Sequence, residues 1–119
     1  MSKLLIVDDE QDILDFAKSF FTKRKIECFT AANGREAITL TKNEKPNLIL
    51  LDIRMEEMNG LDVLAKIREF DPSVKVIMVT GVEEKEALEK AQSLGALAYI
   101  HKPLILEELE KIVLKELNV

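Results

Sequence analysis

The sequence contains one cysteine, and this scarcity of thiols excludes an internal disulfide. Cys28 lies in an apolar stretch, so we expect a half-buried structural thiol rather than a reactive one. Long apolar runs are also missing: no stretch approaches the roughly 20 consecutive apolar residues that a membrane-spanning helix needs. The start, Met1-Ser2-Lys3, leads into an apolar strand pattern without a cleavable signal segment, so we expect a cytoplasmic protein that does not use a membrane.

A basic stripe is missing as well. The net charge is −5, and the Lys and Arg residues are scattered among Asp and Glu, which argues against nucleic acid as a direct ligand. No low-complexity linker divides the chain. Its 119 residues are 47% hydrophobic and 33% charged, so we expect residues 1–119 to form a single globular domain.

Apolar runs rich in β-branched residues predict five strands, at residues 3–8, 26–31, 47–52, 74–80 and 97–101. Several runs are almost continuously apolar, which is typical of strands covered on both faces, as in a parallel sheet. Helical spacing of apolar residues predicts helices between and after the strands, at about 13–20, 34–43, 60–70, 83–94 and 106–117. Asp71-Pro72 would end the third helix, and Gly95 would end the fourth in a left-handed cap.

This alternation of strands and helices predicts an α/β fold with right-handed crossovers and helices on both faces of the sheet. We expect a flavodoxin-like, doubly wound, five-stranded parallel sheet in the order 2-1-3-4-5 with five helices. In such sheets, ligands bind outside the carboxyl ends of the strands, where the strand order reverses.

The carboxyl ends of the predicted strands carry polar residues: Asp8-Asp9-Glu10, Asp52, Thr80-Gly81 and Lys102-Pro103. With strands one and three adjacent, Asp52 would lie within a few ångströms of Asp8 or Asp9. Such carboxylates repel one another unless a cation lies between them or one is protonated. Mg2+ fits this site because it binds one or two carboxylates and completes its coordination with water and phosphoryl oxygens. The ammonium group of Lys102 and the hydroxyl of Thr80 would suit phosphoryl transfer, which depends on positioning and charge neutralisation.

Each of these segments also has a simpler structural explanation. Residues 8–10 could cap the first helix, and on these residues alone that explanation and a metal role stand equal. Thr80-Gly81 and Lys102-Pro103, taken singly, are ordinary strand-end turns. Asp52 differs because it ends an apolar run, where an ionisable group is costly to bury without a purpose. The occurrence of all four segments at one edge of the sheet therefore indicates a functional site.

The motifs at the strand ends are Leu4-Leu5-Ile6-Val7-Asp8-Asp9-Glu10, Leu50-Leu51-Asp52-Ile53-Arg54-Met55 with Gly60 after it, Val79-Thr80-Gly81, and Tyr99-Ile100-His101-Lys102-Pro103. In combination they resemble the receiver domains of bacterial response regulators, and the resemblance spans essentially the whole chain. It implies a phosphorylation-activated switch of a two-component phosphorelay rather than an enzyme that turns over an external substrate. A sensor histidine kinase, a phosphotransfer protein or a small phosphodonor would supply the phosphoryl group.

The resemblance also assigns metal ligands. It implies that Asp9 binds Mg2+ directly and that Asp8 helps to hold the ion, partly through water. Asp52 would be both phosphoacceptor and metal ligand. Arg54 would offer its backbone carbonyl to the metal while its side chain points to solvent.

The resemblance further implies a switch that connects the site to a distant face. Thr80 and Lys102 would bond phosphoryl oxygens, and Thr80 would move inward and open space for Tyr99 to rotate. The face that changes would run from about residue 83 to 117. Pro103 would follow a cis peptide bond that aims Lys102 into the site. That face would serve an unidentified downstream protein and allow a homodimer.

Four residues in or beside these motifs affect the interpretation of the site. Glu56 and Glu57 stand where most receivers have proline and often glycine, so the loop beside the site is more acidic, which bears on partner choice or metal affinity. Leu104 replaces a common phenylalanine, which we expect to be a packing change. His101 could be considered a phosphoryl carrier, but strand alternation predicts that it points away from the site into solvent.

Three other functions fit parts of the pattern. A phosphatase of the haloacid dehalogenase type needs a second aspartate two residues after the nucleophile, where this chain has Arg54. A flavodoxin-type electron carrier needs a Ser/Thr/Gly-rich phosphate loop after the first strand, where Asp8-Asp9-Glu10 would repel a flavin phosphate. A receiver fold that only docks proteins would not need the full set of acids, Thr80 and Lys102.

Overall fold

The computed structural model describes residues 2–81 and 85–118. Strands and helices alternate along the chain, in the order β1 (Lys3–Val7), α1 (Gln11–Thr22), β2 (Glu27–Ala31), α2 (Gly34–Glu44), β3 (Leu48–Asp52), α3 (Gly60–Phe70), β4 (Lys75–Thr80), α4 (Lys85–Ser93), β5 (Ala98–His101) and α5 (Leu106–Leu117). Where the predicted boundaries can be compared, most agree within about two residues. The predicted start of the fourth helix, at residue 83, lies outside the described residues.

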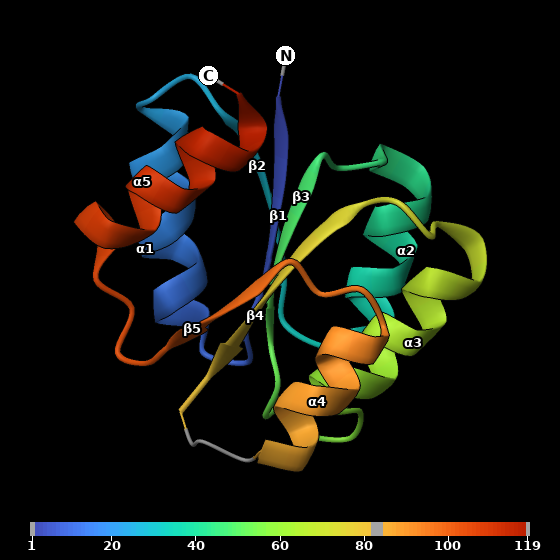
Figure 1. The fold of residues 1–119 in the computed structure, drawn as a ribbon. Coiled ribbons are helices and arrows are strands. Elements are labelled where there is room, and N and C mark those ends of the chain that lie inside the picture. Colours follow the sequence, from blue (N-terminus) through green and yellow to red (C-terminus); the bar gives the residue numbers. More distant parts are fainter. Residues whose placement is uncertain (1, 82–84, 119) are drawn as a thin grey trace.

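The five strands form one parallel sheet in the order β2-β1-β3-β4-β5, which confirms the predicted fold. Helices α1 and α5 cover one face, and α2, α3 and α4 cover the other (Figure 1). The order reverses between β1 and β3, so the carboxyl ends of these two central strands flank the crevice where this fold binds ligands. Among the described residues, no helix has the length and apolarity needed to cross a membrane.

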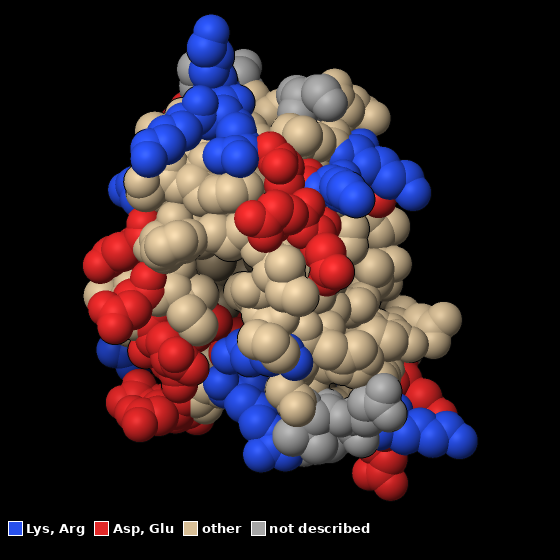
Figure 2. Space-filling model, turned by 90° about the vertical axis from the view of Figure 1, so that its left-hand side faces the viewer, with Lys and Arg blue, Asp and Glu red and all other residues tan. Residues whose placement is uncertain are grey.

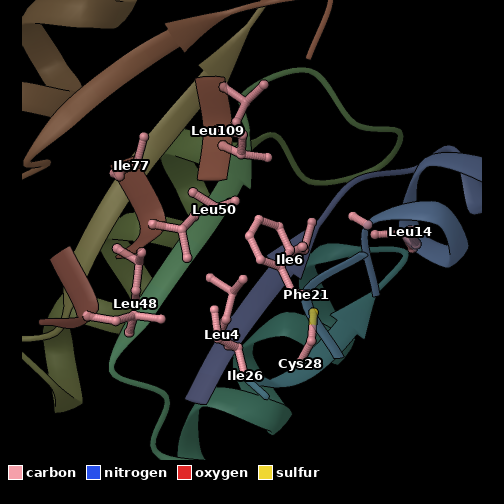
Figure 3. Close-up of a cluster of buried hydrophobic side chains, with 14 residues drawn as sticks. Leu4, Ile6, Leu14, Phe21, Ile26, Cys28, Leu48, Leu50, Ile77 and Leu109 are labelled. Atoms are coloured by element: carbon pink, nitrogen blue, oxygen red, sulfur yellow. The ribbon is translucent and has the colours of Figure 1, made fainter. Parts of the chain in front are cut away.

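Two apolar clusters, one on each face, hold the helices to the sheet. Residues that alternate along β1 and β3 divide between them: Leu4, Ile6, Leu48 and Leu50 belong to the cluster beneath α1 and α5 (Figure 3). All five residues of β3 are buried, as expected for a central parallel strand. The end of β3 is therefore held rigidly by packing on both sides.

Cys28 is more deeply buried than the half-buried thiol that the sequence suggested. Its side chain lies in the cluster beneath α1 and α5, and the residue is 6% exposed. Burial raises the pKa of the Cys28 thiol from 9.0 to about 12, while the charge of Lys18 lowers it slightly. The neutral thiol is thus the form that the fold accommodates.

We expect folded protein at pH 8 to resist modification of Cys28 by thiol reagents, and unfolded protein to react at once. Because the folded pKa of about 12 exceeds the unfolded value of 9.0, the thiol's contribution to stability is complete below pH 9 and is lost as the pH rises towards 12. Urea unfolding of the wild type and Cys28→Ala between pH 7 and 11 checks this prediction, since the difference between them should shrink with rising pH. Rapid labelling of the folded protein would contradict it.

Candidate functional site

The carboxyl ends of β1 and β3 place two aspartates side by side in the central crevice. The two strands pair in parallel register up to Val7 and Leu51, so Asp8 and Asp52 follow at equivalent positions. Asp8 is 2% exposed and Asp52 is 1% exposed. Two buried carboxylates at one edge of a sheet repel each other unless a positive charge lies nearby or one of them is protonated.

Lys102, from the segment after β5, brings that charge. Its Nζ donates a hydrogen bond of 2.8 Å to Oδ2 of Asp52 and lies 3.5 Å from Oδ2 of Asp8. Its backbone N–H donates to the carbonyl of Thr80 at 2.8 Å, and the Lys102–Pro103 peptide bond is cis. The end of β4 therefore anchors the lysine whose side chain joins the two aspartates.

Burial and neighbouring charges shift the pKa values of Asp52 and Lys102. Burial raises the pKa of Asp52 above its ordinary value, because the hydrogen bond and the charge of Lys102 offset only part of the desolvation and Asp8 adds repulsion. Burial alone would lower the pKa of Lys102, but the hydrogen bond and charge of Asp52, together with Asp8, outweigh it and raise this pKa. Lys102 thus stays cationic. Its single positive charge does not balance the two carboxylates of Asp8 and Asp52.

Beyond Asp8, two exposed acids complete a carboxylate cluster. Asp8, Asp9 and Glu10 each place a carboxylate oxygen within 4.8 Å of the others. Glu10 is the N-cap residue of α1, yet its side chain makes no capping hydrogen bond, and Oδ1 of Asp8 accepts from the Glu10 backbone N–H at 2.9 Å. The structure therefore gives little support to a capping role for these acids. The family resemblance assigns metal roles to Asp8 and Asp9 but none to Glu10, although the position of Glu10 beside Asp9 was a signal for one.

The donors in this crevice fit Mg2+. Carboxylate and carbonyl oxygens are the ligands that a hard divalent cation prefers. The buried carboxylates of Asp8 and Asp52 share a single ammonium group, that of Lys102, so neutralising both carboxylates takes one more positive charge. Arg54 has its side chain exposed, and its backbone N–H donates to Oδ1 of Asp52 at 3.1 Å. The expected ligand segments, after β1 and after β3, thus lie at the same edge of the sheet.

The two residues of the expected switch lie on neighbouring strands, Thr80 on β4 and Tyr99 on β5. Thr80 ends β4 and is 3% exposed, and its Cα pairs in register with that of His101. Tyr99 is 47% exposed and lines a surface groove with His101 and residues of α4 such as Leu88. His101 is exposed on the same side of β5 as Tyr99, as strand alternation predicts. Part of the expected output face, residues 83 and 84, lies outside the described residues.

Charge is unevenly distributed over the surface formed by α1 and α5. On the face that Figure 2 shows, Lys and Arg side chains gather at the upper end, and a group of Asp and Glu side chains lies at the lower left. The lower end is the edge where the strands terminate (Figure 1). Beside the acidic group, at the lower centre of Figure 2, lie further Lys and Arg side chains, so both signs of charge are present at the end where the strands terminate.

Known proteins share both the sequence and the fold. A family model of the response regulator receiver domain matches residues 4–114. The chain is 34% identical to the sporulation initiation phosphotransferase F of Bacillus subtilis, over 97% of this chain and 93% of that protein. It is 36% identical to the regulatory protein AtoC of Escherichia coli, over 99% of this chain but 26% of that protein.

Solved structures agree with these relatives. A CheY-like receiver domain protein from Methanospirillum hungatei superposes with a TM-score of 0.94 at 35% identity, over 99% of this chain and 94% of that chain. The CheX-CheY-BeF3-Mg2+ complex from Borrelia burgdorferi matches with a TM-score of 0.87 at 31% identity, over 96% of this chain and 87% of that chain. The fold, the strand-end acids and the family match together show that this chain belongs to the response regulator receiver domain family.

Proposed function

We propose that the chain is a Mg2+-dependent phosphorylation switch whose phosphoacceptor is Asp52. The observation that carries the proposal is the shared ammonium group of Lys102, 2.8 Å from Asp52 and 3.5 Å from Asp8. It marks Asp52 as a buried carboxylate with a cationic partner already in place for incoming phosphoryl oxygens. Residues 1–119 would act as one receiver unit.

The proposed reaction moves one phosphoryl group to the protein. An oxygen of Asp52 attacks phosphorus and a P–O bond forms, while the bond from phosphorus to the donor breaks and the leaving group keeps the electron pair. A carboxylate that leaves an acyl phosphate departs as the anion, whereas the imidazole that leaves a phosphohistidine takes up a proton. Lys102 would pair with one phosphoryl oxygen and the Thr80 hydroxyl would bond another. The donor would be a sensor histidine kinase, a phosphotransfer protein or a small acyl phosphate. The later loss of the phosphoryl group to water would reset the switch, so the chain would act only on itself.

Asp8, Asp9, Asp52 and the backbone carbonyl of Arg54 would hold Mg2+, with water completing the coordination. When bound, the ion would offset charge on the phosphoryl oxygens. Asp8 is suited to orient the site because it is buried and its Oδ1 is already bound by the Glu10 backbone N–H. Asp9 is exposed and lies on the solvent side, where a hydrated cation can reach it.

The readout would pass through Thr80 and Tyr99. Thr80 is buried at the end of β4, next to the anchoring contact from Lys102, so movement of its hydroxyl towards a phosphoryl group would leave space beside β5. The ring of Tyr99 is 47% exposed and could fill that space. The surface formed by α4, β5 and α5 would then change shape for a downstream protein or a second copy of the chain.

Incubation with acetyl phosphate and Mg2+ is expected to add one phosphoryl group, detected by intact mass spectrometry. Asp52→Asn should abolish the adduct because the amide is a poor nucleophile, whereas Asp62→Asn, which removes an exposed carboxylate of α3, should keep it. Omitting Mg2+ should also prevent phosphorylation. An adduct that survives in Asp52→Asn would refute the assignment. Absence of an adduct from the folded, Mg2+-bound wild type would favour a receiver that only docks proteins.

A further inference from the structure

The loop between β3 and α3 carries two more carboxylates next to the acidic cluster. Glu56 and Glu57 are both exposed, and together with Asp9 they line one polar hollow beside Asn33. Asp9 belongs in turn to the cluster with Asp8. Acidic side chains from two different loops therefore meet at the mouth of the crevice.

The backbone holds these glutamates in a tight turn. Glu57 has a φ of 67°, in the left-handed region, and the Met58 N–H donates to the carbonyl of Glu56 at 2.8 Å. Glycine would adopt this conformation without steric cost, so a charged side chain stands here against the local conformational preference. The base of the loop is fixed by the Gly60 N–H, which donates to the carbonyl of Ile53 at 2.7 Å.

We propose that Glu56 and Glu57 act as an outer pair of carboxylates that strengthens divalent cation binding at the site formed by Asp8 and Asp9. This inference rests on the Mg2+ site of the proposed function. Both glutamates are exposed, so they would act on the hydrated ion through bridging water and through long-range electrostatic attraction rather than as direct ligands. Charges that act in this way lose much of their effect once the Debye length falls below their distance from the ion. Strong dependence on ionic strength is therefore the signature of this role.

The test is an NMR chemical-shift titration with MgCl2 alone, without a phosphodonor, on the full chain. Glu56→Gln/Glu57→Gln should raise the Kd for Mg2+ by about three- to tenfold at low ionic strength, and the difference should fall below about twofold in 0.5 M KCl. The matched control is Glu44→Gln/Glu69→Gln, which changes the net charge by the same amount. These two residues lie at the carboxyl-terminal ends of α2 and α3, whereas Glu56 and Glu57 precede the amino-terminal end of α3. The control should leave the Kd within about twofold of the wild type.

Glu57→Gly provides a second variant that removes charge while relieving the backbone, and it should also weaken Mg2+ binding. An unchanged Kd in the double variant, or an equal change in the control, would overturn the inference while leaving the proposed function intact. A wild type that binds no Mg2+ would overturn both. Phosphorylation of the double variant at saturating Mg2+ should still occur, because Asp52 and Lys102 are unaltered.

Discussion

Gly60→Ala is expected to destabilise the protein by about 3 kcal/mol or more and to prevent efficient phosphorylation of Asp52. A Cβ at position 60 would overlap the carbonyl oxygen of Asp52 and lie 2.8 Å from the Cα of Ile53. Both neighbours are backbone atoms of the phosphoacceptor segment, so no side-chain rotation can relieve the clash. Relief would require moving the end of β3 or the start of α3, and either movement displaces the carboxylate that Lys102 contacts.

Helix propensity and the steric clash predict opposite effects of Gly60→Ala on the free energy of unfolding, so the measurement distinguishes them. Gly60 is the first residue of α3, where alanine has the better helix propensity, so propensity alone predicts stabilisation. Gly81→Ala is the matched control, since a Cβ there meets no atom of residues 2–81 and 85–118 within 4 Å, and we expect a change within about 0.5 kcal/mol. Urea unfolding gives both free energies, and acetyl phosphate labelling gives the effect on the site. A Gly60→Ala variant that is stable and normally phosphorylated would contradict the prediction. It would show that the backbone at Asp52 and Ile53 can move to accommodate a Cβ without loss of stability or function.

The sequence predicted the fold well because the signals that determine it are local. Continuous apolar runs such as that of β3 identify buried parallel strands, and polar residues such as Asp52 and Thr80 mark their ends. Once strands alternate with helices, the topology brings those ends to one edge without further information. The left-handed cap at Gly95, with a φ of 81°, was predictable for the same reason, since it depends on the residue type itself.

Features that depend on contacts between distant segments could not be predicted in this way. Arg68 donates hydrogen bonds to the backbone carbonyls of Leu94 and Gly95, after α4, and to those of Asp71 and Val74, before β4. In the sequence it is one more charged residue on a helix, because nothing local indicates which carbonyls its side chain reaches. The deep burial of Cys28 and the sharing of Lys102 by two carboxylates depend on the assembled fold in the same way.

Lys102→Met should lower the free energy of unfolding in Mg2+-free buffer by about 2–3 kcal/mol and abolish phosphorylation. Breaking a fully buried ion pair costs about 3–5 kcal/mol, and the smaller value applies because the lysine side chain is 24% exposed and partly screened. Among residues 2–81 and 85–118, no buried side-chain nitrogen or oxygen lacks a hydrogen-bond partner, so the variant would introduce a defect that the wild type avoids. Methionine preserves the length of the side chain, which leaves the missing charge as the main change.

The pH dependence and a second-site variant separate this charge effect from a loss of packing. Burial already raises the pKa of Asp52, and removal of the ammonium group raises it further, so protonation of the carboxyl favours the folded variant. The stability difference between the wild type and Lys102→Met should therefore narrow as the pH falls from 8 towards 5, and Mg2+ at pH 8 should narrow it too. Asp52→Asn should suppress most of the defect, because only Asp8 then remains uncompensated. A difference that is independent of pH, Mg2+ and Asp52 would show that the lysine contributes by packing and that the electrostatic account of the site is wrong.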